Sequence, residues 1–156
     1  MIALPVAFKG APGSPYTRKM MALMRYRHIP YRYLVGTAAD KAGMPKAAVE
    51  LLPTFYLPDA QGQLQAVTDS TPLISRLEQE VAGRSALPSD PVLAFVDALL
   101  EDFADEWVTK AMFHYRWKFA EGIAKASDII PPHYVGVSAD ETLLDTVKAQ
   151  FSQRQI

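Results

Sequence analysis

The sequence contains no cysteine among its 156 residues. This absence excludes disulfides, zinc–thiolate sites and any mechanism in which a cysteine is the nucleophile, and it fits a reducing compartment. No apolar run approaches the roughly 20 residues that a membrane-spanning helix needs. The N-terminus has neither the basic start nor the long apolar core of a secretory signal. We therefore expect a soluble, cytoplasmic protein with no membrane partner.

An excess of charge of either sign is also missing. Lys and Arg number 16 against 17 Asp and Glu, so the formal net charge is −1. A charge so close to zero gives no field that would attract a polyanion, and we do not expect nucleic-acid binding. The composition is that of an ordinary globular protein, with 49% apolar and 21% charged residues. The length suits one domain, or a small domain and part of a second.

The first 82 residues alternate between strand and helix patterns. Short apolar runs predict strands at 4–8, 30–35, 54–58 and 64–67, and the residues DAQG at 59–62 predict a hairpin turn. Helices are predicted at 16–28, at 38–51, where Gly43 and Pro45 interrupt the pattern, and at 69–81, with Ser70 or Thr71 as N-cap. The order β-α-β-α-β-β-α predicts an α/β domain with a four-stranded mixed sheet.

A linker rich in Gly, Pro and Ser at 83–90 separates this domain from a helical region at 91–156. Apolar residues recur at three- and four-residue steps over 91–119, which predicts a long helix. A loop is predicted around 128–136, and a final helix begins with a capping box formed by Ser138 and Glu141. Two or three helices make a thin domain, which must pack on the first domain, on a partner chain or on further sequence.

The stretch APGSPYTRK at 11–19 is the first candidate site. The N-terminus of a helix carries unpaired N–H groups and a partial positive charge, and both favour an anion. The hydroxyl of Ser14 could also donate to a thiolate and lower the pKa of that thiol. By itself the motif favours the simpler interpretation, in which Ser14 is the N-cap and Pro15 the first residue of the helix.

The stretch LLPTFYL at 51–57 is the second. A proline directly before a strand belongs at the strand start, because it has no N–H for the sheet. If the Leu52–Pro53 bond is cis, the backbone N–H and C=O of Leu52 point outward and can pair with an extended, peptide-like ligand. Only about 5–6% of X–Pro bonds in folded proteins are cis, so the sequence by itself favours trans.

The stretch TDSTP at 68–72 is the third. Asp69 could hold an amine, while the Ser70 hydroxyl and the first N–H groups of the helix could hold a carboxylate. The alternative is again an ordinary helix cap.

In this order, the three motifs and the helical region that follows resemble the glutathione transferase superfamily. The resemblance implies a thioredoxin-like N-terminal domain at 1–82, an all-α C-terminal domain at 91–156, glutathione as co-substrate, no metal and a homodimer. It also implies a cis bond before Pro53. The helical region is shorter than is typical of the family, and we interpret it as shortened or truncated.

The resemblance assigns roles to single residues. Ser14 corresponds to the hydroxyl that hydrogen-bonds the glutathione sulfur in serine-type members, with Tyr16 as an alternative. Leu52 and Pro53 correspond to the element that pairs with the cysteinyl part. Asp69 and Ser70 correspond to the pair that binds the γ-glutamyl end. With no cysteine at position 14, the resemblance argues against a disulfide-exchanging thioltransferase or a dehydroascorbate reductase.

The helical region offers weaker candidates. The resemblance places the first long helix beside the electrophile, so His114, Tyr115 or Trp117 could contact that substrate, although helix packing is the simpler role for most of them. An acidic group could suggest a metal site, but apolar positions interrupt it, and a solvated or interface-facing helix side explains it better: Glu101, Asp102, Asp105 and Glu106. The three histidines do not have metal-ligand spacing.

Three functions remain open at this point. The first is a transferase in which Ser14 stabilises the glutathione thiolate, which attacks an unknown small electrophile in a conjugation or lysis reaction. The second is a binding or assembly module that keeps the fold without catalysis. The third is a thioredoxin-like domain that binds an extended peptide at Pro53.

Overall fold

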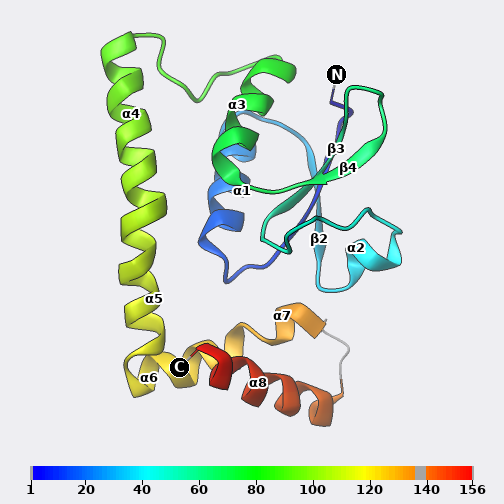
Figure 1. The fold of residues 1–156 in the computed structure, drawn as a ribbon, viewed down its shortest axis with the longest axis vertical. Helices are drawn as coiled ribbons and strands as arrows, with labels where there is room; N and C mark the ends of the chain where they lie inside the picture. Colours follow the sequence, from blue (N-terminus) through cyan, green and yellow to red (C-terminus); the bar gives the residue numbers. More distant parts are fainter. Residues whose placement is uncertain (1, 136–139, 156) are drawn as a thin grey trace. The chain divides into compact units, whose positions relative to one another are not determined.

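The computed structural model describes residues 2–135 and 140–155. The chain divides into two compact units, Met1–Ala86 and Leu87–Ile156 (Figure 1). The division falls within the stretch 83–90, where Gly, Pro and Ser are concentrated.

A four-stranded mixed sheet forms the centre of the first unit. Its strands are β1 (Val6–Gly10), β2 (Tyr31–Val35), β3 (Thr54–Pro58) and β4 (Leu64–Val67), in the order β2-β1-β3-β4. β1 is parallel to β2 and antiparallel to β3, and β3 is antiparallel to β4. A parallel pair needs a crossover connection, which the helix between β1 and β2 supplies. The predicted mixed sheet is confirmed.

Helices cover both faces of this sheet (Figure 1). Successive side chains of β1 point to opposite faces of the sheet. Val6 and Phe8 belong to the main core, together with residues of α1 (Pro15–Tyr26) and α3 (Ser70–Glu80). Ala7 packs on the other face, in a smaller cluster with α2 (Ala38–Lys41). Phe8 stacks on Phe55 of the neighbouring strand, with ring centroids 5.0 Å apart. The unit therefore has the thioredoxin-like architecture that the family resemblance implies.

The helix predicted at 38–51 is wrong in its length, because only Ala38–Lys41 is helical. Gly43 ends it with a φ of +65°, a left-handed conformation that glycine adopts without a side-chain clash. Pro45 follows two residues later and has no N–H with which a helix could continue. The chain then runs to β3 without a further helix or strand.

The second unit is all-helical. α4 (Pro91–Phe103), a π-helical turn η1 (Ala104–Val108) and α5 (Thr109–Trp117) follow one another along the predicted long helix. They are followed by α6 (Ala120–Ile129), α7 (Pro132–Val135) and α8 (Glu141–Gln155). The architecture of an α/β domain followed by an all-α region agrees with the fold class predicted from the sequence.

The loop predicted around 128–136 is largely wrong. α6 continues to Ile129, and α7 begins at Pro132, where a proline is tolerated because the first N–H of a helix needs no partner. The predicted capping residue Ser138 lies outside the described residues. The Oδ1 atom of Asp140 accepts a hydrogen bond of 2.8 Å from the N–H of Leu143, in the first turn of α8.

A small core joins α5, α6 and α8. Trp117, Ala126 and Ile130 are buried together, and the rings of Trp117 and Phe151 lie 5.8 Å apart. α6 also approaches α5 closely, because a Cβ atom at Gly122 would lie 2.5 Å from the carbonyl oxygen of Tyr115. Trp117, a possible electrophile contact in the sequence, therefore packs inside the helical unit.

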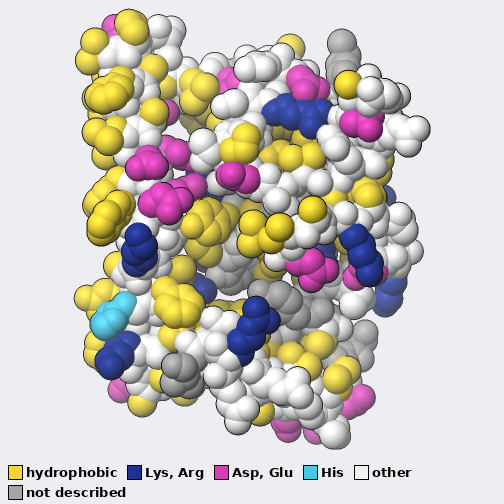
Figure 2. Space-filling model, viewed as in Figure 1, with side chains coloured by type: hydrophobic (Ala, Val, Ile, Leu, Met, Phe, Trp, Pro, Cys, Tyr) yellow, Lys and Arg dark blue, Asp and Glu magenta, His cyan; other side chains and the backbone are white. Residues whose placement is uncertain are grey.

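α4 has no buried residue along its whole length. Figure 2 shows yellow, hydrophobic side chains over this helix, along the left edge of the view. The large apolar side chains that are exposed along it are Val92, Leu93, Phe95, Val96, Leu99, Leu100 and Phe103. Among the described residues, no helix is both long enough and apolar enough to cross a membrane.

Candidate functional site

The sheet register brings the three sequence motifs to the same end of the sheet in the first unit. Lys9, near the end of β1, is opposite Thr54, the first residue of β3. Phe55 is in turn opposite Val67, the last residue of β4. The chain therefore leaves β1 toward motif 11–19, enters β3 from motif 51–57 and leaves β4 toward motif 68–72, all at the same end of the sheet.

Close packing sets the start of α1 against the end of β1. A Cβ atom at Gly10 would lie 2.7 Å from the Cγ2 atom of Thr17, so only glycine leaves room for the helix here. Thr17 is fully buried, and its Oγ1 atom accepts a hydrogen bond of 3.3 Å from the N–H of Ala11. These contacts hold the intervening loop, which carries Ser14, in one position.

Ser14 is the N-cap of α1, as the sequence predicts. Its Oγ atom accepts a hydrogen bond of 3.2 Å from the N–H of Thr17, and Pro15 follows it at the start of the helix. The same hydroxyl donates to the carbonyl oxygen of Leu52 over 3.4 Å. Ser14 is thus both a helix cap and a contact between the first and second motifs.

The bond between Leu52 and Pro53 is cis, as the family resemblance implies and not trans as the sequence by itself favours. Pro53 is buried directly before β3, and Leu52 is half-buried. Thr54 reaches back across the motif, and its hydroxyl donates to the carbonyl oxygen of Leu51 over 2.6 Å. No hydrogen bond from the N–H of Leu52 is found among residues 2–135 and 140–155. The Leu52 carbonyl, in contrast, accepts from Ser14, so only one of its two backbone groups is without a partner in the described chain.

The N-cap of α3 is Asp69, so the prediction of Ser70 or Thr71 at this position is wrong. The Oδ1 atom of Asp69 accepts a hydrogen bond of 3.3 Å from the N–H of Thr71. A carboxylate is as good an N-cap as a hydroxyl, and the negative charge also favours the positive end of the helix dipole. Asp69 has a φ of +79°, which is rare outside glycine, and its side chain is exposed.

Ser70 is the first residue of α3 and is 5% exposed. Its Oγ atom accepts a hydrogen bond of 3.0 Å from the Nζ atom of Lys19, which comes from the second turn of α1. Lys19 lies at the same end of the sheet, and the sequence did not assign it to the site. The only sequence signal for it was its presence as one of two adjacent cations in the first motif, and nothing in the sequence distinguished it from Arg18.

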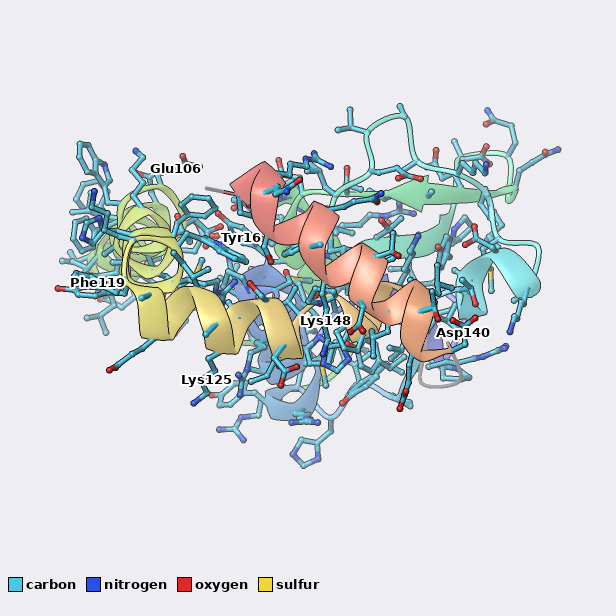
Figure 3. All side chains as sticks on the ribbon, turned by 90° about the horizontal axis from the view of Figure 1, so that it is seen from below. Tyr16, Glu106, Phe119, Lys125, Asp140 and Lys148 are labelled. Atoms are coloured by element: carbon cyan, nitrogen blue, oxygen red, sulfur yellow. The ribbon has the colours of Figure 1, made fainter. Side chains whose placement is uncertain are left out.

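These contacts connect all three motifs through α1. Ser14 reaches the second motif and Lys19 reaches the third. The half-buried Tyr16, which Figure 3 labels, lies between them in the sequence. The arrangement offers a hydroxyl at a helix N-terminus, a backbone amide before a strand, and a carboxylate beside a hydroxyl and an ammonium group. Such a set of groups can bind an extended ligand that has an anion near one end and both an amine and a carboxylate at the other.

His114 and Tyr115 lie on α5 in the helical unit, and both are exposed. With Phe119 they form an aromatic cluster: the ring centroid of His114 lies 5.5 Å from that of Tyr115 and also from that of Phe119 (Figure 3 labels Phe119). The acidic residues of the long helix include the exposed Glu106, which Figure 3 labels. In the part of the chain that the structure describes, no group of three His, Asp or Glu residues could hold a metal ion.

Comparison with known proteins identifies the family of the first unit. The sequence profile of the glutathione S-transferase N-terminal domain matches residues 8–85, which is half of the chain. Among solved structures, the chain is similar to a glutathione transferase family member from Pseudomonas fluorescens Pf-5 with bound S-(propanoic acid)-glutathione. The identity is 20%, the TM-score is 0.41, and the match covers 96% of this chain and 64% of that chain. No curated protein matches the sequence.

Proposed function

The chain belongs to the glutathione S-transferase superfamily, and from that membership we propose that it binds glutathione and transfers it to a small electrophile. In this proposal residues 1–82 form the glutathione-binding domain, 83–90 the linker and 91–156 the helical domain. A cytoplasmic location fits this reaction, because cytosolic glutathione is kept reduced.

The observation that carries the proposal is the position of Ser14. Its hydroxyl sits at the N-terminus of α1 and also touches the Leu52 carbonyl, directly before Pro53. A thiol placed here would lose its proton to solvent more easily, because a hydrogen bond and the helix dipole both stabilise the thiolate. The thiolate sulfur then attacks the electrophilic carbon, a carbon–sulfur bond forms, and a leaving group departs with its electron pair.

Ligand binding would exchange the partners of the Leu52 carbonyl. When Ser14 turns its hydrogen toward the sulfur, that carbonyl loses its donor, and a half-buried carbonyl without a partner is unfavourable. A peptide N–H from the ligand can replace the lost donor, while the N–H of Leu52 donates to a ligand carbonyl. Both exchanges need an amide of the kind that the cysteinyl part of glutathione has. At the other end of the ligand, Asp69 would bind the γ-glutamyl amine and Ser70 the carboxylate.

Two measurements on a Ser14→Ala variant test this proposal. We expect calorimetry to detect glutathione binding to the wild-type protein, and turnover of an electrophile panel to fall about a hundredfold in the variant, as for the loss of other charge-stabilising donors. Ser75→Ala on the exposed side of α3 is the matched control and should keep full turnover. Absence of glutathione binding by the wild-type protein, or unchanged turnover in Ser14→Ala, would contradict the proposal.

A second candidate function is a binding module without catalysis. The small core of the helical unit favours it, because the described residues of this unit include few buried apolar side chains: Trp117, Ala126, Ile130 and Pro131. A pocket for an electrophile would have to be built largely from exposed side chains such as His114 and Tyr115. Glutathione binding by calorimetry, without turnover of any electrophile in the panel, would favour this candidate over the transferase.

We also propose that the protein forms a homodimer in which α4 packs against a second copy. Val92, Val96, Leu99 and Phe103 recur at four- and three-residue steps, so the exposed apolar side chains share one side of this helix, the pattern of a helix that packs against a partner. Val92 and Phe95 are 68% and 69% exposed, so the described chain does not cover them. Exposed apolar patches of this kind mark association surfaces, and a net charge of −1 gives little repulsion between two copies.

A further inference from the structure

Lys19 and Ser70 come from two different helices and meet at the end of the ligand site proposed above. Their side chains lie 51 positions apart in the sequence and are joined by a hydrogen bond of 3.0 Å from Nζ to Oγ. Ser70 is 5% exposed, so it has little freedom to turn to another position. α1 and α3 pack on the same face of the sheet, which holds the two residues together.

The chemistry of this pair is that of a carboxylate receptor. An ammonium group has three hydrogens and no lone pair, so Lys19 can donate to Ser70 and to a ligand at the same time. A hydroxyl that accepts from an ammonium group directs its own hydrogen to a third group, and it is a stronger donor because the ammonium polarises it. Two donors that converge in this way, one of them charged, match the two oxygens of a carboxylate.

We propose that Lys19 is a binding residue for the α-carboxylate of the γ-glutamyl end, acting together with Ser70. The inference rests on the proposed function and adds a charged partner to it. Asp69, with the opposite charge, precedes Ser70 in the chain and suits the α-ammonium group of the same ligand end. The site therefore selects ligands that end in a free α-amino acid, and it discriminates against ligands in which that carboxylate is missing or esterified.

The neighbouring cation provides a matched control. Arg18 precedes Lys19 on α1 and is exposed. Successive residues of a helix differ by about 100° in direction, so Arg18 and Lys19 point to different sides. A general effect of positive charge on an anionic ligand would be similar for both residues, whereas a direct contact with the carboxylate belongs to Lys19 alone.

The experiment measures two ligands against four proteins by calorimetry. The ligands are glutathione and 4-aminobutyryl-cysteinylglycine, which lacks only the α-carboxylate of the γ-glutamyl residue. The proteins are the wild type, Lys19→Met, Lys19→Gln and Arg18→Met. Lys19→Gln keeps a donor that can reach toward Ser70 but removes the charge, and it covers the case in which Lys19→Met fails to fold.

We expect both Lys19 variants to bind glutathione about ten- to a hundredfold more weakly than the wild type, the range for a charge-assisted hydrogen bond. They should bind the analogue as the wild type does, because the carboxylate that Lys19 contacts is gone. Arg18→Met should stay within about threefold of the wild type for both ligands, which is the range of a screened surface charge.

Equal weakening of both ligands by the Lys19 variants would overturn the inference, since it would mean a structural effect rather than a carboxylate contact. Unchanged glutathione affinity in both variants would overturn it as well. If the wild-type protein binds neither ligand, the proposed function itself fails. That result is distinct from the two others, in which the wild type still binds glutathione.

Discussion

Arg27 and Glu78 form a buried ion pair between the end of α1 and the last turn of α3. The Nε and Oε1 atoms lie 3.1 Å apart, and the two side chains are 2% and 11% exposed. Both residues also hold the segment that follows α3: Arg27 donates to the carbonyl oxygens of Val81 and Arg84, and Glu78 accepts from the N–H of Ala86. The path of the chain out of the first unit therefore depends on one pair of charges.

Removing one of these charges should destabilise the first unit strongly. In Arg27→Met the carboxylate of Glu78 stays buried without its partner, and breaking a buried pair in this way costs about 3–5 kcal/mol. Urea unfolding followed by circular dichroism measures the loss. The control is Lys148→Met on the helical unit (Lys148 is labelled in Figure 3). It removes the ion pair with the exposed Asp128, and it should leave the unfolding midpoint nearly unchanged because exposed ion pairs contribute little to stability. A loss below about 1 kcal/mol in Arg27→Met would contradict the structural role assigned to the pair.

The two candidate hydroxyls of the first motif, those of Ser14 and Tyr16, can be distinguished by their effects on the bound thiol. The structure gives Ser14 a contact with the Leu52 carbonyl, which favours it over Tyr16 as the partner of the sulfur. We expect Ser14→Ala to raise the pKa of bound glutathione toward its ordinary value, and Tyr16→Phe to leave it near the wild-type value. Thiolate absorbance as a function of pH measures this pKa. The opposite result, a raised pKa in Tyr16→Phe alone, would assign the role to Tyr16.

Ser14→Ala should also lower stability, because Ser14 caps α1. Loss of an N-cap hydroxyl costs about 1 kcal/mol. Ser14→Asp keeps the cap but places a negative charge beside the sulfur, so it should restore the stability and not the low thiol pKa. Stability and thiol pKa together thus separate the capping role from the proposed chemical role.

Two tyrosines of the first unit should ionise late in an alkaline titration. Burial raises the pKa of Tyr33 above its ordinary value of 10.0, and the neighbouring Tyr31 adds to the shift. Burial likewise raises the pKa of Tyr56, with a smaller contribution from the charge of Asp40. In an ultraviolet titration of the seven tyrosines, part of the absorbance change should therefore occur at a pH above the ordinary tyrosine pKa. Tyr56→Phe should reduce the size of that part.

The same shifts determine the direction of the pH dependence of stability. Above pH 10 the unfolded chain loses the two tyrosine protons first, so the folded state binds more protons and the free energy of unfolding falls as the pH rises. Below the ordinary pKa both states are protonated and the two residues add no pH dependence. A free energy of unfolding that rises with pH above 10 would contradict the assigned shifts.

The proposed dimer depends on the apolar side chains of α4. Placing a charge at the exposed Phe95 in Phe95→Glu should shift the protein from dimer to monomer in analytical ultracentrifugation, because the charge would be desolvated in the interface. Gln153→Glu adds the same charge at an exposed position of α8 and should keep the dimer. A wild-type protein that sediments as a monomer at all accessible concentrations would disprove the pairing.

The sequence predicts the first unit well because its signals are local. Each strand is a short apolar run bounded by turn residues, and Gly62 with a φ of +81° completes the hairpin turn that DAQG predicts. The cap of α3 was misassigned because aspartate and serine are nearly equal N-caps, so the sequence TDSTP fits several starting points. The contact between Lys19 and Ser70 could not be predicted, since it depends on the packing of two helices rather than on spacing along the chain.

The helical unit was harder to predict for a different reason. Its helices have few buried positions, so apolar periodicity does not mark their ends. α6 begins at Ala120 only three residues after α5 ends at Trp117, and the tight approach at Gly122 makes this change of direction possible. The two prolines at 131 and 132 suggested a loop, yet one of them begins a helix.

The π-helical turn Ala104–Val108 has a consequence for how this part of the chain can change. Such a turn contains one residue more than an α-helical turn, so every side chain beyond it is rotated by about 100° around the helix axis. The apolar side of α4 is therefore out of phase with the side of α5 that carries Trp117. Deleting a single residue within the turn would restore one continuous phase and redirect all of α5 at once. The loss of one codon would thus change which side chains of the second unit share a side of the helix, without a substitution at any other position.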